Sequence, residues 1–149
     1  GPGLACLGAY NPQIYPSPWC VQGWMANTFY SAETVTIPDG DGEGVTTTIV
    51  ACGLASVPVD VVVTLTIDHP EPSDLVVTLF DPQASPDAPG DGATSILWNH
   101  EADGATTIVA KIPGDDSVNG QWKLQVKDTV AGGAGILKGW SIYLLSRWD

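Results

Sequence analysis

The 149-residue sequence predicts an all-β fold, an antiparallel two-sheet β-sandwich built as one domain. Three observations predict it. Short runs rich in Val, Thr and Ile recur along the chain, several of them alternate between apolar and polar residues, and turns that contain Gly or Pro separate them. No segment combines a helical period of 3.6 residues with helix caps. Strands that each have one polar face are typical of two sheets packed face to face.

Four strands are expected in the first part of this body, over residues 33–38, 45–51, 59–68 and 74–81. The third has the clearest alternation, and its expected inward residues are Val59, Val61, Val63, Leu65 and Ile67. The fourth repeats the pattern, with an inward face made of Leu75, Val77 and Leu79.

Four more strands are expected over 94–98, 105–112, 121–127 and 136–145. In 121–127, Trp122, Leu124 and Val126 alternate with Gln and Lys, so they are expected in the core. In 136–145 the expected core residues are Trp140, Ile142 and Leu144. Turn residues at 38–40, 70–72, 86–92, 113–116, 119–120 and 132–133 separate the eight strands.

Residues 1–32 differ from the rest, because they are rich in Pro, Gly and aromatic residues and show no sustained period. We expect an N-terminal extension or linker there, followed by the sandwich over 33–149. A disulfide between Cys6 and Cys20 is expected to close a loop in the extension, which would stabilise it by about 3 kcal/mol and imply an oxidising, extracellular compartment. Cys52 would then remain as a small buried residue.

The charge distribution restricts the partners. The formal net charge is −12, all five basic residues lie at or after Lys111, and thirteen of the seventeen acidic residues precede it. A nucleic-acid partner is not expected, because phosphate recognition needs a basic patch. No apolar run approaches the roughly 20 residues of a membrane-spanning helix. The acidic residues are expected to be solvated, hydrogen-bonded or cation-bound.

Catalytic motifs are absent from the sequence. There is no GxSxG elbow and no HExxH zinc motif, and the two histidines, His69 and His100, are interpreted as polar residues at strand ends. A triad whose members are scattered along the chain would leave no motif, so an enzyme remains the third alternative.

Two groups of acidic residues are candidate calcium ligands. Asp39, Asp41 and Glu43 alternate with glycines and place hard oxygen ligands on a flexible loop, and the alternative for them is an exposed turn. Asp74, Glu101 and Asp128 lie at strand ends or on loops that a sandwich gathers at its ends. For Asp74 and Asp128, the alternative is a hydrogen bond that caps a turn.

Several motifs, in order, resemble those of a known family. They are Ile37-Pro38-Asp39-Gly40 before 45–50, Gly53-Leu54 before 61–69, Ser73-Asp74-Leu75, Leu79-Phe80-Asp81-Pro82, Glu101-Ala102, and a C-terminal block of Asn119-Gly120, Trp122, Leu124, Val126, Asp128, Gly135, Leu137, Trp140 and Ile142. Over about residues 34–145 the chain thus resembles the P domain (P/Homo B domain) of subtilisin-like proprotein convertases and related bacterial secreted proteins. Cys52, the acidic insertion at 86–92 and the extension before residue 33 depart from the pattern.

The resemblance implies a jelly-roll-like (galactose-binding-like) sandwich without an active site, which packs on a catalytic domain, supports its folding and tunes its dependence on calcium and pH. We therefore expect a non-catalytic accessory domain of a secreted multidomain protein, such as a peptidase. Its expected partner is the neighbouring catalytic domain or another extracellular protein, and calcium is the one cofactor expected. The alternative is a lectin-like or adhesin-like module that binds carbohydrate or protein, for which the end loops and Trp19, Trp24 and Trp148 could serve.

Overall fold

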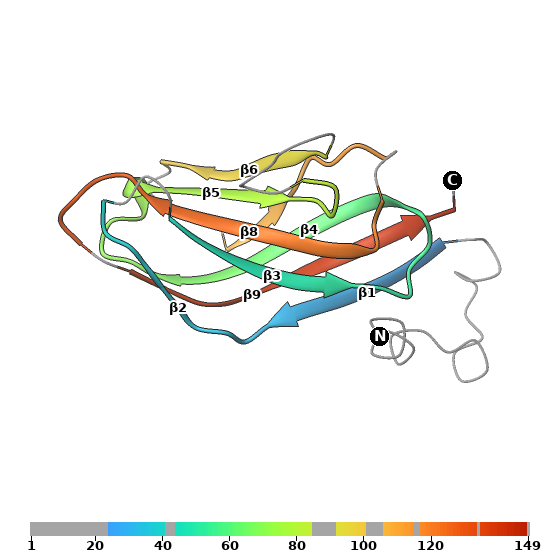
Figure 1. Cartoon of the computed structure of the whole chain (residues 1–149), viewed down its shortest axis with the longest axis horizontal. Helices are drawn as coiled ribbons and strands as arrows, with labels where there is room; N and C mark the ends of the chain where they lie inside the picture. The colour runs from blue at the N-terminus through green and yellow to red at the C-terminus, as the bar shows by residue number, and fades with distance from the viewer. Residues whose placement is uncertain are drawn as a thin grey trace.

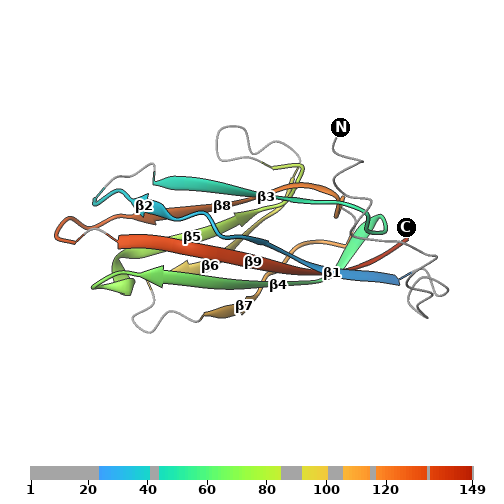
Figure 2. The ribbon, with the colours of Figure 1, turned by 90° about the horizontal axis from the view of Figure 1, so that it is seen from below.

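A computed structural model describes residues 24–40, 44–84, 92–100, 106–114, 117–133 and 135–148. These residues form two antiparallel β-sheets packed as a sandwich, with β3 and β8 in one layer and β4 and β9 in the other (Figures 1 and 2). The predicted fold class is confirmed. In the part of the chain that the structure describes, no helix has the length and apolar character that a membrane-spanning helix needs.

Along the described residues the strands follow one another, with a short 3-10 turn before β5. They are β1 (Trp24–Ser31), β2 (Val35–Ile37), β3 (Val45–Ala51), β4 (Val57–Asp68), η2 (Pro72–Asp74), β5 (Leu75–Phe80), β6 (Thr94–Asn99), β7 (Thr107–Val109), β8 (Gly120–Asp128) and β9 (Gly135–Arg147).

The strand order is that of a jelly roll. The five-stranded sheet has the order β1-β9-β4-β7, with β2 also paired to β9, and the four-stranded sheet has the order β3-β8-β5-β6. Most connections between consecutive strands therefore cross from one sheet to the other, as in a jelly roll. Strands that are distant in sequence become neighbours, and the connecting loops collect at the two ends of the sandwich (Figure 1).

The core lies between the sheets and contains the inward residues that alternation predicts. Leu75, Val77 and Leu79 of β5 and Trp122, Leu124 and Val126 of β8 are fully buried, as are Ile142 and Leu144 of β9. The indole N–H of Trp122 donates to the carbonyl oxygen of Val118 at 2.9 Å, so its burial leaves no unsatisfied donor.

One predicted inward residue of β4 is not in the core. The register of β4 against β9 shifts between Pro58 and Asp60, which leaves Val59 in a bulge and 37% exposed. A bulge inserts one extra residue, so the alternation on its two sides is out of phase by one position. The prediction is correct for Val61, Val63 and Leu65, which are buried, and wrong for Val59.

The sandwich also begins earlier than residue 33, where the sequence placed its start. All eight residues of β1, Trp24–Ser31, pair with β9, from Trp24 opposite Arg147 to Ser31 opposite Trp140. The hydroxyl of Ser146 donates to the carbonyl oxygen of Met25 at 2.7 Å and fixes the start of this strand. Hence β1 is an integral strand of the five-stranded sheet.

Cys52 follows β3 and is half-buried, whereas the sequence predicted a buried residue. Cys6 and Cys20 are the chain's only other cysteines, and both lie outside the described residues, as does the bond expected between them.

Asn119, the residue before β8, holds the β3–β4 connection. Its side-chain oxygen accepts from the N–H of Leu54 at 3.0 Å, and its amide nitrogen donates to the carbonyl oxygens of Leu54 at 3.2 Å and Ala55 at 2.8 Å. The Asn119-Gly120 motif of the sequence is thereby a clamp between the start of β8 and the loop before β4.

Candidate functional site

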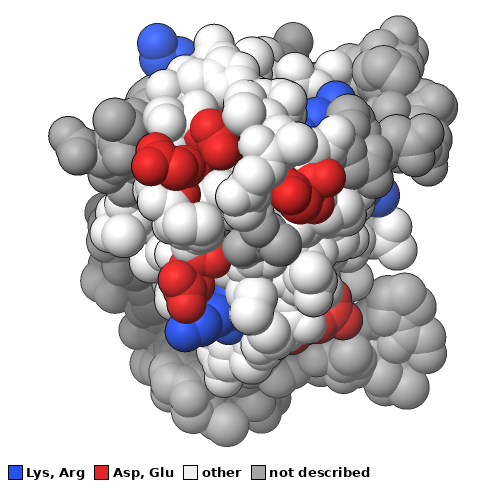
Figure 3. Space-filling view, turned by 90° about the vertical axis from the view of Figure 1, so that its left-hand side faces the viewer, with Lys and Arg blue, Asp and Glu red and all other residues white. Residues whose placement is uncertain are grey.

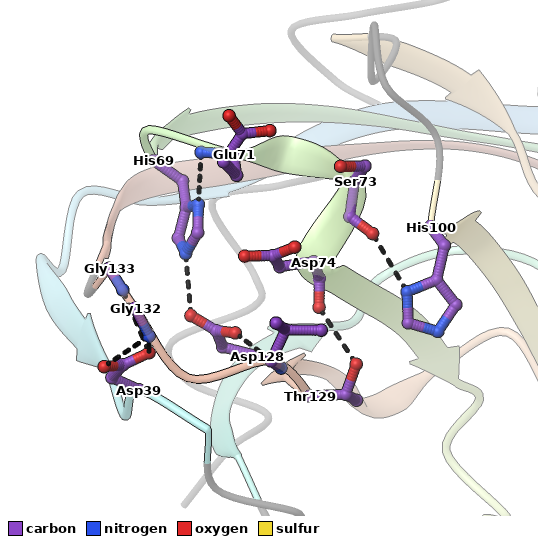
Figure 4. A network of polar contacts seen from close by, with 11 residues as sticks. Asp39, His69, Glu71, Ser73, Asp74, His100, Asp128, Thr129, Gly132 and Gly133 are labelled. Carbon is purple, nitrogen blue, oxygen red and sulfur yellow. Dashed lines mark hydrogen bonds and ion pairs between the residues drawn. The ribbon is translucent and has the colours of Figure 1, made fainter.

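The polar side chains that the sequence singled out gather at one end of the sandwich, on the left in Figure 1. The β2–β3, β4–β5, β6–β7 and β8–β9 connections meet there, and the close view in Figure 4 shows their side chains turned toward one another. We call this region the polar end and define it by Asp39, His69, Asp74, His100, Asp128 and Thr129.

A buried His–Asp pair lies at its centre. His69 follows β4 and Asp128 ends β8, and both side chains are 0% exposed. Nε2 of His69 lies 2.7 Å from Oδ2 of Asp128, and Nδ1 accepts from the N–H of Glu71 at 2.9 Å. Because Nδ1 is the acceptor, the proton of the neutral ring is on Nε2, which donates it to the carboxylate. Both ring nitrogens thus have fixed partners.

Two carboxylates hold the β8–β9 connection. Oδ1 of Asp128 accepts from the N–H of Val130 at 3.1 Å. Oδ1 and Oδ2 of Asp39 both accept from the N–H of Gly132, and Oδ1 also accepts from that of Gly133, each at 3.2 Å. Asp39 is exposed and Asp128 is buried, so the two carboxylates hold the same connection from outside and inside.

Backbone carbonyls connect the remaining loops. The carbonyl oxygen of Asp74 accepts from both the N–H and the hydroxyl of Thr129, at 3.0 and 3.2 Å. Nδ1 of His100 donates to the carbonyl oxygen of Ser73 at 3.0 Å, and the N–H of His100 donates to that of Leu75. The hydrogen bonds drawn in Figure 4 thereby tie four connections into one unit.

The His–Asp pair cannot act as the base of a catalytic triad in this arrangement. A triad histidine needs one ring nitrogen for the carboxylate and the other for the nucleophile's hydroxyl or thiol. The second nitrogen of His69 is held by the N–H of Glu71, and its side chain has no exposed surface. The pair is therefore a structural element that joins the end of β4 to the end of β8.

Several separate acidic groups lie on the outside of the polar end, among uncharged side chains (Figure 3). Asp39, Asp68 and Glu71 are exposed there, and Lys138 approaches Asp68 at 3.6 Å with both side chains more than half exposed. An ion pair this exposed contributes little to stability.

Three of the six predicted calcium ligands are brought to this end, namely Asp39, Asp74 and Asp128. The other three, Asp41, Glu43 and Glu101, lie outside the described residues. Among the residues that the structure describes, no group of three or more His, Cys, Asp or Glu side chains is arranged to hold a metal ion. For Asp128 the alternative of a capping hydrogen bond is confirmed by its bond to Val130.

Sequence reasoning missed the pairing of His69 with Asp128. The two residues are 59 positions apart, and each was read separately, as a strand-end histidine and as a turn cap. The sequence feature that could have indicated the pair is that His69 and Asp128 each stand at the end of a clearly alternating strand. Recognising the pair required knowing that β4 and β8 end at the same edge of the sandwich.

Comparison with known proteins identifies relatives of this chain. Residues 58–144 match the family described as the proprotein convertase P-domain. Leupeptin-inactivating enzyme 1 of Streptomyces exfoliatus is 30% identical over 119 residues, which are 77% of this chain and 25% of that protein.

Solved structures give the same fold. The serine protease of Aeromonas sobria matches 95% of this chain with a TM-score of 0.66 and 19% identity. The complex of that protease with its chaperone ORF2 matches 85% of the chain with a TM-score of 0.68 and 18% identity. The matched parts are 29% and 27% of those chains, so this chain spans about a quarter of the length of the proteins it matches.

Proposed function

We propose that this chain, which belongs to the proprotein convertase P-domain family, is a non-catalytic accessory domain of a longer secreted polypeptide, where it docks on a neighbouring peptidase domain and stabilises it. The observation that carries the proposal is the family match over 58–144, together with its extent: the chain corresponds to a quarter of a bacterial enzyme named for inactivating leupeptin and to a similar share of a serine protease. A disulfide among Cys6, Cys20 and Cys52 would imply an oxidising compartment and so belongs to the same proposal.

The polar end supports a non-catalytic role. Its buried histidine uses both ring nitrogens in fixed contacts, and its carboxylates hold backbone amides in place. Such a network makes the loops rigid. A rigid sandwich suits a domain whose task is to present a surface to a neighbour.

The test compares the full-length polypeptide with a form that lacks this domain. We expect the peptidase domain of the shortened form to melt at a lower temperature and to lose activity faster at that temperature, because a bound partner stabilises the folded state. Adding the separate 149-residue chain back should restore part of the loss. Equal melting temperatures and equal activity in the two forms would contradict the proposal.

We also propose that calcium binds at the polar end, with ligands from the set Asp39, Asp41, Glu43, Asp74, Glu101 and Asp128. What supports it is the acidic surface of this end; Asp39 and Asp128 already accept hydrogen bonds from backbone amides, so the remaining members would carry most of the coordination. Thermal melts of EDTA-treated protein with millimolar Ca²⁺ and with Mg²⁺ test this. A rise in melting temperature specific to Ca²⁺ is expected, and no rise would remove calcium from the proposal.

A further inference from the structure

The outer face of the five-stranded sheet carries a continuous row of uncharged side chains across four strands. Thr28 of β1 lies opposite Tyr143 of β9, Tyr143 opposite Val62 of β4, and Val62 opposite Val109 of β7. Residues directly opposite in antiparallel strands point to the same face. Val109 is 67% and Tyr143 37% exposed, so this face is turned to solvent.

A second row lies beside the first and is also uncharged. It contains Tyr30, which is 79% exposed, followed by Ser141, Thr64 and Thr107. We call the eight residues of the two rows the outer patch. Charged residues stand at its borders, with Asp60 and Arg147 toward one end and Lys138 and Asp68 toward the other.

The outer face of the other sheet has a different character. Its central strand, β8, turns Gln121, Lys123, Gln125 and Lys127 outward, and the first three lie opposite Val50, Thr48 and Thr46 of β3. Two of the chain's five basic residues thus lie in the middle of that face, a position where an interface would have to remove them from water. The outer patch has no such obstacle.

Resting on the proposed function, we infer that the outer patch is the surface that contacts the neighbouring peptidase domain. An uncharged centre with aromatic side chains and a charged border is the anatomy of a protein interface. Its Thr, Ser and Tyr residues make it more polar than the interface of an obligate dimer, and domains joined in one chain use polar interfaces of this kind.

The relatives indicate which partner covers the outer patch. About three quarters of each matched protein lies outside the part that corresponds to this chain. A partner in the same polypeptide is held at high effective concentration, so a modest interface is sufficient to keep it docked. The inferred partner is therefore a tethered domain with a complementary neutral surface.

The test places a charge of either sign at matched positions on the two outer faces of the full-length polypeptide. Thr64→Lys and Thr64→Glu change the outer patch, and Thr46→Lys and Thr46→Glu change an exposed threonine on the other sheet. Burying an unpaired charge is costly whatever its sign, whereas attraction to a charged partner would favour one sign only. Both Thr64 variants should therefore separate the domains, and neither Thr46 variant should.

The readouts are the radius of gyration from small-angle scattering and the rate at which an added protease cleaves between the domains. For the Thr64 variants we expect a larger radius and cleavage at least about tenfold faster than in the Thr46 variants. The 149-residue chain by itself, carrying each substitution, should melt within about 2 °C of the unchanged chain, since exposed strand positions tolerate such changes. This control separates lost docking from lost folding.

Three outcomes would overturn the inference. Separation by the Thr46 variants would move the docking face to the four-stranded sheet and leave the proposed function intact. Full-length protein that is unaffected by all four variants, although deletion of the domain destabilises the peptidase, would place the contact elsewhere. Binding of a glycan to the 149-residue chain that Thr64→Lys abolishes and Thr46→Lys does not would assign the patch to carbohydrate.

Discussion

Replacing Asp128 by Asn tests whether the buried His–Asp pair holds the polar end together. The carboxylate accepts two hydrogen bonds, from Nε2 of His69 at 2.7 Å and from the N–H of Val130 at 3.1 Å. An Asn side chain has one oxygen, so its NH2 group must face one of these two donors. The other tautomer of His69 does not relieve the conflict, because it would turn an Nδ1–H toward the N–H of Glu71.

The expected cost follows from one buried donor left without an acceptor, which is about 1–3 kcal/mol. For a domain of about this size, each kcal/mol lowers the melting temperature by roughly 2–4 °C. Urea unfolding of the 149-residue chain under non-reducing conditions measures the free energy of unfolding directly. The matched control is Asp39→Asn, whose carboxylate is exposed and accepts at 3.2 Å, and which should cost less than about 0.5 kcal/mol.

Unfolding of the Asp128 and Asp39 variants at the same urea concentration would refute a supporting role for the His–Asp pair. A free energy of unfolding for Asp128→Asn within about 0.5 kcal/mol of the unchanged protein would refute it too, because two donors facing each other in a buried site should destabilise the fold.

Three further predictions concern the packing around this framework. Gly135→Ala should cost about 1–3 kcal/mol in urea unfolding, because the added Cβ would overlap Cδ2 of His69. Its control is Gly114→Ala, which should be nearly neutral because the added Cβ meets only a carbonyl oxygen at 3.4 Å. Asn119→Ala should cost about 1–3 kcal/mol and accelerate hydrogen exchange at the N–H of Leu54, which loses its acceptor; unchanged exchange at that amide would contradict the clamp. Peptide mapping without reduction should find one disulfide among Cys6, Cys20 and Cys52, and three free thiols would contradict the expected oxidising compartment.

The central strands were predictable because each is buried on one side and wet on the other. Trp122, Leu124 and Val126 alternate with Gln and Lys, and β8 has its neighbours β3 and β5 on both sides, so burial decides every second position. Alternation reports this directly, since hydrophobic burial is the largest favourable contribution to folding. The same reason explains the correct inward faces of β5 and β9.

The edge strand β1 could not be predicted in this way. Of its eight residues only Met25 is buried, and its inward positions include Asn27 and Ser31, which interrupt the apolar pattern. What holds β1 is its backbone pairing with β9, more than 100 residues later in the chain. Backbone hydrogen bonds between strands depend little on which side chains the strands carry, so this pairing leaves no pattern in the sequence.

The sequence predicted the residue types of the candidate site and the capping bond of Asp128, but it missed the pairing of Asp128 with His69. Asp39 and Asp128 were selected as possible metal ligands because carboxylates at strand ends bind cations or cap turns, and the sequence holds no information on which of these applies. The outcome depends on the partners that the fold brings within reach, which are the N–H groups of Val130, Gly132 and Gly133 and the ring of His69.

The same contacts also hold the two sheets in position relative to each other. The carboxylates and His69 join the ends of β4 and β8, one from each sheet, so they fix the position of the two sheets relative to each other at the polar end. Met25 and Ser146 join β1 to β9 near the other end. Because β4 is held at the polar end and β1 is held to β9 near the other end, the outer patch that these strands share is a preorganised surface, and docking on it would require little further ordering of this domain.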